Sequence, residues 1–366
     1  MDTKTADKAK IYSSRKYFLS IIGTFYSLVV LLVFQASGFS RMLAGFLYET
    51  VPHYLVAAPY ILVVFVVYYI LDFPLNLYQS FILEHRFSLT KQKFAAWISD
   101  QSKSGLISYF IGLILLLAFY YIFNHSGRSW WWIISLFWVF FSIVLAKVFP
   151  LIIIPLFFKY SPYSDVAIKE RIMRLAEKMQ VKILDIFQID FSKKTLKANA
   201  AFVGLGSTKR VLLADTLKDK YSADEIEVIL AHEFAHYKLK HLFKLLLLNA
   251  GTTMLIFYFI FRTSNVVLGW FSLGNLSDVA ALPIVMVYFI LFGVIMQPIH
   301  NFISRRFEKE ADIMAIKTTG LKDAFISTMD KLGTQNLADR RPHPAIKLFF
   351  FDHPPIDERI NLAKKL

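Results

Sequence analysis

The stretch Ile229–Leu248, ILAHEFAHYKLKHLFKLLLL, carries two histidines four residues apart around a glutamate and then runs into apolar sequence. On an α-helix, positions i and i+4 lie on the same face, so His232 and His236 can direct their imidazoles at one ion. Glu233 flanks that ion, where it can take a proton from an attacking water. The spacing therefore predicts a catalytic metal site at the start of an apolar helix.

The composition places this motif in a membrane protein. Of the 366 residues, 56% are hydrophobic and 19% are charged, and the mean hydropathy is +0.49. A soluble protein of this length would not carry so much apolar sequence. The net charge is +14, but the basic residues form no nucleic-acid reader motif, so nucleic acid is not an expected partner. The chain has no cysteine, which excludes disulfides and thiolate ligands.

Six apolar stretches are long enough to cross a bilayer, for which roughly 20 residues are needed. They cover about residues 17–36, 55–78, 105–124, 130–158, 242–262 and 281–300. The polar N-terminal segment is too long for a signal peptide and no cleavage site follows it, so the first stretch is expected to be a retained span. The fourth stretch contains Pro150 and Pro155 and is expected to be kinked.

The distribution of basic residues predicts the orientation. Of the 41 lysines and arginines, 37 fall on one side of the six spans and only 3 lie in the alternate loops. The side rich in lysine and arginine normally faces the cytoplasm. Both termini and the active site are therefore expected on the cytoplasmic side, in an endoplasmic reticulum or bacterial inner membrane.

The fold class that we expect is mainly α, a polytopic membrane protein with about six transmembrane helices. A cytoplasmic zinc-metallopeptidase domain with a small β-sheet completes it. Residues 301–366 are expected to be helical, with a proline-rich loop. The chain is expected to begin with a membrane region of four spans at 1–158, followed by a catalytic segment with the HExxH helix at 159–241. Two further spans at 242–300 and a C-terminal catalytic segment at 301–366 complete the expected organisation.

Local patterns describe the first catalytic segment in more detail. An amphipathic helix is predicted at 164–180 and short strands at 183–190 and 209–214. Between them, ANAAFVGLGSTKR (198–210) predicts a third strand followed by a glycine-rich turn. A capping box, Ser222 to Glu225, opens the helix that carries the histidines.

A third protein ligand is expected, because catalytic zinc usually has three. Glu308, in SRRFEKEAD, follows the sixth span by about 8 residues and so lies roughly 12 Å beyond it. The histidines lie roughly 9–15 Å outside the fifth span. Because these spans are antiparallel neighbours, Glu308 is expected at the height of the histidines. Asp312, one turn later, can accept the second N–H of a ligand histidine, whereas Glu310 points away.

These features resemble the integral-membrane zinc CAAX prenyl proteases, which share a superfamily with shorter heat-shock membrane proteases. The similarity extends to further blocks, namely LNLYQSFILEHRFSLTKQ, IIPLFFKYSPY, KANAAFVGLGSTKRVLLADTL and DHPPIDERI. It covers most of the chain from about residue 70. The chain departs from the family in one respect: the family typically has seven spans around a large chamber, and six are counted here.

The resemblance implies one Zn²⁺ ion per chain. It makes His232, His236 and Glu308 the zinc ligands and Glu233 the general base that activates water. Hydrolysis of peptide bonds by a metalloendopeptidase follows from these roles.

The resemblance also implies four further site residues. Asn199 and Ala200 match an edge strand that pairs with the substrate backbone. His353 and Arg359, in HPPIDER, match residues near the active site. The histidine would stabilise an oxyanion, and the arginine would bind a carboxylate or hold the loop.

Three functions are compatible with the sequence. The leading hypothesis is a membrane-embedded zinc endopeptidase that cleaves near the C-terminus of prenylated or membrane-associated proteins. The second has the same chemistry but serves membrane-protein quality control without prenyl specificity. The third is a non-catalytic membrane protein with a structural zinc. A peptide or protein substrate and the lipid bilayer are the expected partners, and the oligomeric state stays open.

Overall fold

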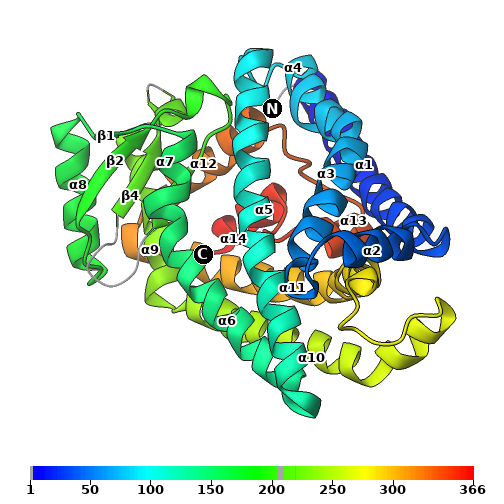
Figure 1. Cartoon of the computed structure of the whole chain (residues 1–366). Helices are drawn as coiled ribbons and strands as arrows, with labels where there is room; N and C mark the ends of the chain where they lie inside the picture. The colour runs from blue at the N-terminus through cyan, green and yellow to red at the C-terminus, as the bar shows by residue number, and fades with distance from the viewer. Residues whose placement is uncertain (1–2, 204–209, 219) are drawn as a thin grey trace.

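The computed structural model of the protein describes residues 3–203, 210–218 and 220–366. It is mainly helical with one small sheet, as predicted (Figure 1). Within the described residues six helices are long and apolar enough to cross a membrane, which confirms the six predicted spans. The spans consist of α1 (Thr3–Ala36), α3 (Ala57–Leu77) continued by α4 (Leu83–Arg86), α5 (Phe94–His125), α6 (Trp130–Val148) continued by α7 (Ile154–Phe157), α10 (His241–Trp270) and α11 (Leu282–Thr319).

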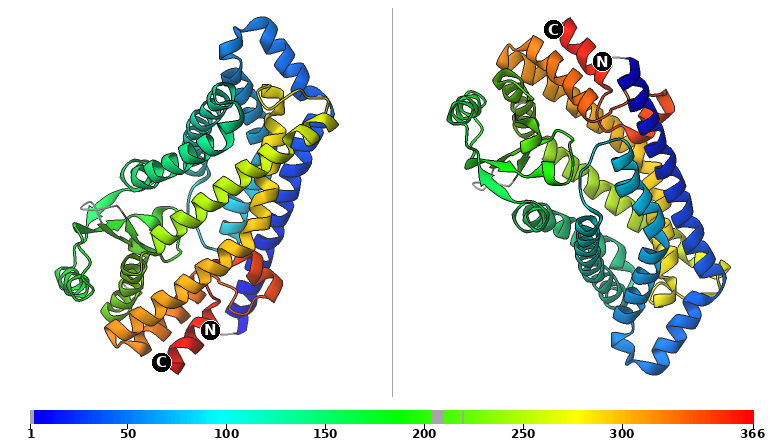
Figure 2. Two further views of the ribbon diagram at one scale, coloured as in Figure 1. Left: turned by 90° about the horizontal axis from the view of Figure 1, so that it is seen from below. Right: turned by 90° about the horizontal axis from the view of Figure 1, so that it is seen from above.

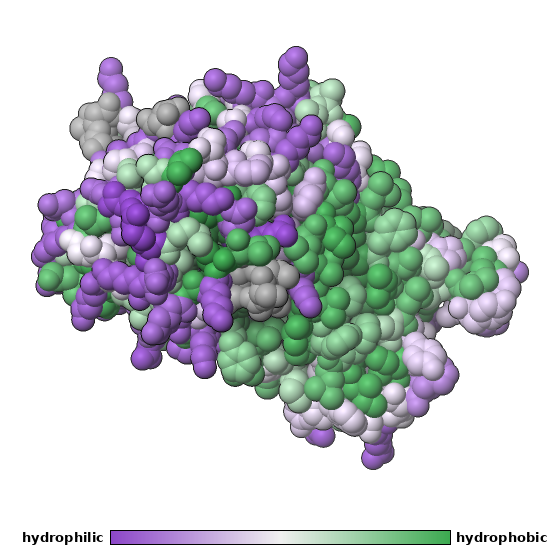
Figure 3. All heavy atoms as spheres, turned by 90° about the vertical axis from the view of Figure 1, so that its left-hand side faces the viewer, coloured by the Kyte–Doolittle hydropathy of each residue, from purple (hydrophilic) through white to green (hydrophobic). Residues whose placement is uncertain are grey.

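The long helices form an elongated bundle with the sheet at one side. Helices α1, α10 and α11 run side by side along the molecule (Figure 2). The face of the molecule seen in Figure 3 carries a broad apolar region bordered by polar side chains. Outward side chains such as Phe25, Ile70 and Phe140 are exposed, which suits contact with lipid tails.

The membrane region differs in two features from six straight spans. The fourth span changes to a π-helical turn at Phe149–Ile153, where Pro150 removes a backbone donor, in line with the expected kink. An additional helix, α2 (Phe39–Thr50), was not predicted and covers the end of the bundle. Its buried Ser40 donates a hydrogen bond to the Ala280 carbonyl at 2.7 Å, which ties α2 to the start of the sixth span.

The sheet has the strand order β1-β2-β4-β3, so β3 is its last strand. Strand β2 pairs antiparallel with β1 and parallel with β4, and β3 pairs antiparallel with β4. The bounds are β1 Tyr160–Pro162, β2 Asp185–Ile189, β3 Ala200–Val203 and β4 Arg210–Ala214. The last three confirm the predicted strands. Strand β1 was missed because three residues that include a proline carry no strand pattern. The predicted glycine-rich turn, 204–209, lies outside the described residues.

One face of the sheet packs on two helices, α8 (Val166–Lys178), which confirms the predicted amphipathic helix, and α9 (Ala223–Lys238). Ile186 and Val211 from the strands and Phe234 from α9 are fully buried there. The capping box is formed: the Ser222 hydroxyl accepts from the Glu225 N–H, and the Glu225 carboxylate accepts from the Ser222 N–H. Since α9 carries the histidine motif, this core holds the motif against the sheet.

The histidine helix does not continue into the fifth span. Lys240 adopts a left-handed backbone conformation, with φ 56°, and α10 begins only at His241. The sixth span, in contrast, runs as one helix to Thr319 even though it contains Pro298. The remaining chain is helical with a proline-rich connection, as predicted, in α12 (Lys322–Gln335), α13 (Pro344–Phe350) and α14 (Ile356–Lys365).

Candidate metal centre

The histidine helix and the extended sixth span approach each other through small side chains. Four alanines, two per helix at a spacing of four, have no exposed surface. They are Ala231 and Ala235 on α9 and Ala311 and Ala315 on α11. Because an alanine adds only one methyl group to the backbone, the two helices can pack closely. Side chains that flank these alanines on each helix therefore face one another across the interface.

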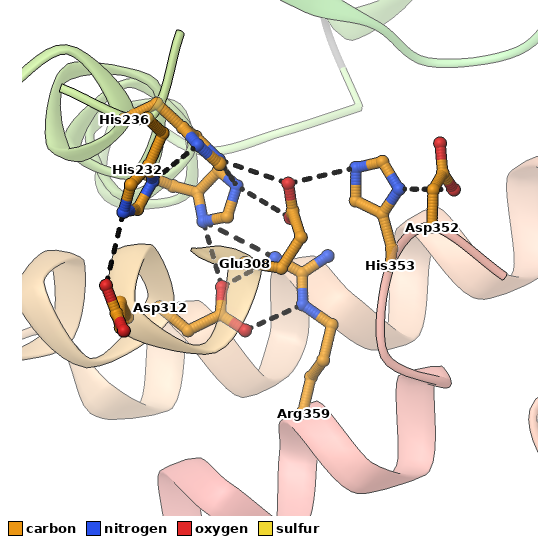
Figure 4. Close-up of polar contacts among 9 residues, drawn as sticks. His232, His236, Glu308, Asp312, Asp352, His353 and Arg359 are labelled. Atoms are coloured by element: carbon orange, nitrogen blue, oxygen red, sulfur yellow. Dashed lines mark hydrogen bonds and ion pairs between the residues drawn. The ribbon is translucent and has the colours of Figure 1, made fainter. Parts of the chain in front are cut away.

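Three side chains from this interface converge on one point (Figure 4). The His232 and His236 Nε2 atoms are 3.1 Å apart. The Glu308 carboxylate lies 3.2 Å from each of them, through Oε2 and Oε1 respectively. Two ligand atoms of a tetrahedral zinc, each about 2.0–2.1 Å from the metal, are separated by about 3.3 Å. The spacing of the three groups thus fits a single zinc ion.

The burial of these groups supports the same conclusion. The Glu308 side chain is only 7% exposed, and its Oε2 atom is buried without a hydrogen-bond partner in the described chain. A buried acceptor of this kind normally has a partner. Burial by itself would lower the pKa of His232, but Asp312 and Glu308 outweigh it and raise the pKa to about 10. The pocket therefore stabilises positive charge, which a metal cation would supply.

The far nitrogen of His232 is held by a buried ion pair. Its Nδ1 lies 2.9 Å from Asp312 Oδ1, so it can donate to the fully buried carboxylate. The Arg359 guanidinium binds the same carboxylate twice, at 2.6 Å and 2.8 Å (Figure 4). Burial by itself would lower the pKa of Arg359, but Asp312 outweighs it and raises the pKa. This arrangement directs Nε2 of His232 toward the metal position.

The far nitrogen of His236 is held by a residue that the sequence analysis missed. Its Nδ1 lies 3.0 Å from Nδ1 of His241, which is 1% exposed and stacks on Phe307. The second nitrogen of His241 lies 3.3 Å from Glu310. Glu310 thus points away from the metal position, as predicted, and supports a ligand histidine from behind. In the sequence, His241 is the third histidine of the opening stretch, in KLKH, and its nearness to the motif could have indicated this role.

The flanking glutamate lines a cleft beside the ligands. Glu233 borders a cavity of about 210 Å³ that also contains His232, His353 and Ala200. Burial raises the pKa of the Glu233 carboxyl, and the neighbouring histidines offset only part of the effect. A carboxylate with a raised pKa is suited to take up and release a proton near neutral pH.

The edge strand β3 forms another wall of the same cleft. The Asn199 carbonyl accepts from the Ala214 N–H at 3.1 Å, which extends the β3–β4 pairing by one residue. Since alternate residues of a strand direct their backbone groups to opposite sides, Ala200 presents its N–H and C=O to the open edge. The Asn336 side chain, also missed in the sequence analysis, accepts from the Ala198 N–H at 3.0 Å. It caps the open edge just before Ala200.

The C-terminal proline-rich loop contributes His353. Its Nε2 lies 3.4 Å from Glu308 Oε1, and its Nδ1 lies 2.8 Å from Asp352 (Figure 4). Burial by itself would lower the pKa of His353, but Asp352 and Glu308 outweigh it and raise the pKa. The imidazole therefore lies beside the Glu308 carboxylate as a potential hydrogen-bond donor.

The segment that leads into β3 is tied to the membrane helices. Lys197 binds Glu84 of α4 at 2.8 Å and Tyr12 of α1 at 2.9 Å. The Leu196 N–H donates to the Leu89 carbonyl at 2.8 Å. The block LEHRFSLTKQ, which had no role in the sequence analysis beyond resemblance, thus holds the approach to the edge strand.

Comparison with known proteins adds the family. Residues 1–159 match a family model described as CAAX prenyl protease N-terminal, five membrane helices, and residues 162–366 match peptidase family M48. The described part of residues 1–159 contains four candidate spans. The additional helix α2, with 12 residues, is too short to cross a bilayer.

Relatives and a solved structure agree over nearly the whole chain. CAAX prenyl protease 1 from Saccharomyces cerevisiae is 30% identical over 390 residues, which cover 98% of this chain and 86% of the yeast protein. The uncharacterized metalloprotease YhfN from Bacillus subtilis is 29% identical over 362 residues, 98% of this chain and 85% of YhfN. The crystal structure of S. mikatae Ste24p superimposes with a TM-score of 0.89 at 28% identity, over 99% of this chain and 90% of that one. The chain therefore belongs to the CAAX prenyl protease and peptidase M48 family of integral membrane metalloproteases.

Proposed function

We propose that this protein is a zinc-dependent endopeptidase that cleaves near the C-terminus of prenylated (CAAX-type) or membrane-associated proteins. The supporting observation is the convergence of His232, His236 and Glu308 beside a second, flanking carboxylate, Glu233, in an accessible cleft. Structural zinc sites are normally closed by four protein ligands, whereas catalytic sites keep one position open. The arrangement therefore favours catalysis over a purely structural metal.

The residues of the chain divide the chemistry between them. When bound, zinc supplies a Lewis acid that lowers the pKa of water and polarises a carbonyl group. Glu233 takes the proton from the attacking water and passes it to the leaving amine. His353, which faces the metal position, donates a hydrogen bond to the developing oxyanion. Asp312 and His241 keep the two ligand histidines in place.

The substrate backbone would bind at the open edge of the sheet. An extended peptide can add to β3 as a further strand, with Ala200 exchanging backbone hydrogen bonds with it. Arg359 was expected to bind a carboxylate or to hold the loop. Its guanidinium already binds the carboxylate of Asp312, so we assign it to positioning His232.

The class of substrate divides the two enzyme hypotheses. The yeast relative is named as a CAAX prenyl protease, whereas the Bacillus relative is named only as a metalloprotease. A source organism without protein prenylation would favour membrane-protein quality control. Both hypotheses require the same metal site and the same edge strand.

An assay on purified protein tests the proposal. We expect hydrolysis of a farnesylated CAAX peptide, and the same peptide without the prenyl group distinguishes the two hypotheses. Equal cleavage of both peptides would favour quality control. Glu233→Gln should keep one zinc per chain and abolish hydrolysis, while Glu177→Gln, on the exposed face of α8, should change neither. Persistent hydrolysis in the Glu233→Gln protein would refute its assignment as the base.

The proposed cytoplasmic active site can be tested separately. Because the chain has no cysteine, a single cysteine placed at the exposed Asp323 reports the side of the membrane on which α12 lies. A membrane-impermeant maleimide added outside intact cells should label this cysteine only after the membrane has been permeabilised. Labelling from the opposite face would overturn the orientation.

A further inference from the structure

A second cleft, of about 850 Å³, lies between α11 and the C-terminal helices α13 and α14. Arg305 of α11 donates to the carbonyl oxygens of Lys347 and Phe351 at 3.0 Å and 2.5 Å, which holds α13 against α11. The ion pair of Arg359 with Asp312 joins α14 to the same helix. The cleft borders this ion pair, and of the described residues the three candidate metal ligands do not line it. It is therefore a separate cavity behind the metal site.

Six basic and three acidic side chains line this second cleft. Each acidic group already has a basic partner within the lining. The three pairs are Asp312 with Arg359, Glu358 with Lys347 and Glu310 with Arg306. Lys309 and Lys365 are exposed and have no acidic partner in the part of the chain that the structure describes. This basic cleft, as Arg305, Lys309 and Lys365 define it, has an excess of positive charge that a bound anion would balance.

The basic cleft lies at the border of the membrane. The apolar part of the sixth span ends near residue 300, so Arg306 lies roughly 9 Å and Lys309 roughly 14 Å beyond it along α11. The headgroup layer of a bilayer is roughly 5–8 Å thick on each side, and a lysine can extend its ammonium group toward it. Phe302, in the wall of the cleft, and Leu348 of α13 are 62% and 43% exposed. Basic groups at headgroup level thus adjoin apolar side chains that can contact lipid tails.

We infer that the basic cleft binds the headgroup of an anionic phospholipid from the surrounding bilayer. Phosphate oxygens accept charge-assisted hydrogen bonds from lysine and arginine, and basic pockets between helices at a membrane surface bind such headgroups. A zwitterionic lipid would bring its own cation close to Lys309 and should bind less tightly. Inorganic phosphate has the same anionic chemistry but no acyl chain for Phe302 and Leu348 to contact. The site goes beyond the proposed endopeptidase function and does not depend on it.

The test measures lipid binding to the zinc-loaded protein in neutral detergent. Phosphatidylglycerol or phosphatidylcholine is titrated in, and the rise in unfolding temperature gives an apparent affinity. Wild-type protein should bind phosphatidylglycerol at least about tenfold more tightly, because one basic residue near an anionic headgroup contributes about fivefold in affinity. Lys309→Gln combined with Lys365→Gln should remove this preference, whereas arginine at both positions should retain it. Zinc content verifies that each variant keeps the metal site.

A matched pair of lysines separates a specific site from general attraction between a basic protein and an anionic lipid. Lys8 and Lys10 are exposed, do not line the cleft, and lie roughly 11–14 Å outside the first span, at a similar height to Lys309. Lys8→Gln combined with Lys10→Gln removes the same charge and should retain the preference.

Three results would overturn the inference. They are equal binding of both lipids by wild-type protein, an equal loss of preference in the Lys8 and Lys10 control, and stabilisation by inorganic phosphate that matches phosphatidylglycerol. The last result would assign the cleft to a soluble anion. Because the measurement needs no hydrolysis, a protein that cleaves no peptide but keeps the lipid preference would refute the proposed function and leave this inference standing.

Discussion

The contact between Asp312 and His232 provides the most direct test of how the metal site is built. Asp312 is fully buried and is shared between the His232 ring and the Arg359 guanidinium. Asp312→Asn preserves the shape but removes the charge. Its amide has one acceptor oxygen, and its NH₂ group would face a donor on either His232 or Arg359. One of the two contacts must therefore be lost.

Two magnitudes follow from this geometry. Loss of a carboxylate behind a metal-binding histidine typically weakens metal affinity 10- to 100-fold, or by about 1.4–2.7 kcal/mol. Removal of one partner of a buried ion pair costs about 3–5 kcal/mol of stability. For Asp312→Asn we expect both effects. Arg359→Leu should lose stability as well, yet retain more zinc affinity, because the carboxylate still faces His232.

The assay is a zinc competition titration against a chelator, in detergent at neutral pH, combined with thermal unfolding of the zinc-free protein. Asp323→Asn, an exposed aspartate on α12, is the control and should match wild type in both measurements. Zinc affinity of Asp312→Asn within about twofold of wild type would refute the reasoning, because the expected loss is at least about tenfold. Equal loss of zinc affinity in Arg359→Leu would show that the arginine, and not the carboxylate, orients the histidine.

Three further outcomes are expected. His241→Phe preserves the ring stacking but leaves His236 Nδ1 without its partner, so zinc affinity should fall by about tenfold in the same titration. Burial would raise the pKa of Glu225, but its lysine and serine partners outweigh it and lower the pKa below the ordinary 4.5. The ionised Glu225 carboxylate therefore stabilises the fold fully above pH 4.5, and this contribution is lost as the pH falls through the folded-state pKa. The difference in unfolding temperature between wild type and Glu225→Gln should accordingly shrink as the pH is lowered below 4.5. Glu84→Gln loosens the approach to β3, and kcat/KM should fall by up to about 10²-fold while zinc content stays unchanged.

Each of these outcomes has a result that would contradict it. Unchanged zinc affinity in His241→Phe would remove this histidine from the metal site. A constant difference in unfolding temperature between pH 7 and the acid range would show that Glu225 does not titrate as described. Parallel loss of zinc and activity in Glu84→Gln would indicate general damage to the fold.

Sequence patterns were sufficient for a prediction where all the residues of a pattern lie in one secondary-structure element. His232 and His236 are one helical turn apart, so their convergence needed only the geometry of a helix. Hydropathy alone predicted the six spans, because a bilayer needs an apolar run of a set length. The distance of Glu308 beyond the sixth span could be predicted because α11 runs unbroken from the membrane to this residue. The height predicted for the histidines assumed a continuous helix that is broken at Lys240, so their approach to Glu308 depends on the packing of α9 against α11. A distance calculated from the rise per residue is valid only along a continuous helix.

The contact of Asp312 with a histidine was predicted, but two other roles that depend on contacts between elements were not. On a continuous helix His241 would lie about 140° around the axis from His236. The break at Lys240 turns it back to face that ring. Arg359 was expected near the site, but only the packing of α14 against α11 shows that its guanidinium binds Asp312.

The sequence by itself determined the membrane class, the placement of His232 and His236 on one helix face, and the choice of Glu308 as the candidate third ligand, since each depends on periodicity or on distance along one helix. The tertiary structure alone decided that Arg359 and His241 support these groups, and what lies beside them. The cleft that Glu233 lines combines α9, β3 and the loop of His353, segments that are far apart in the chain. No local pattern encodes such a cavity, because its shape is set by how separate elements pack and not by the conformation of any one of them.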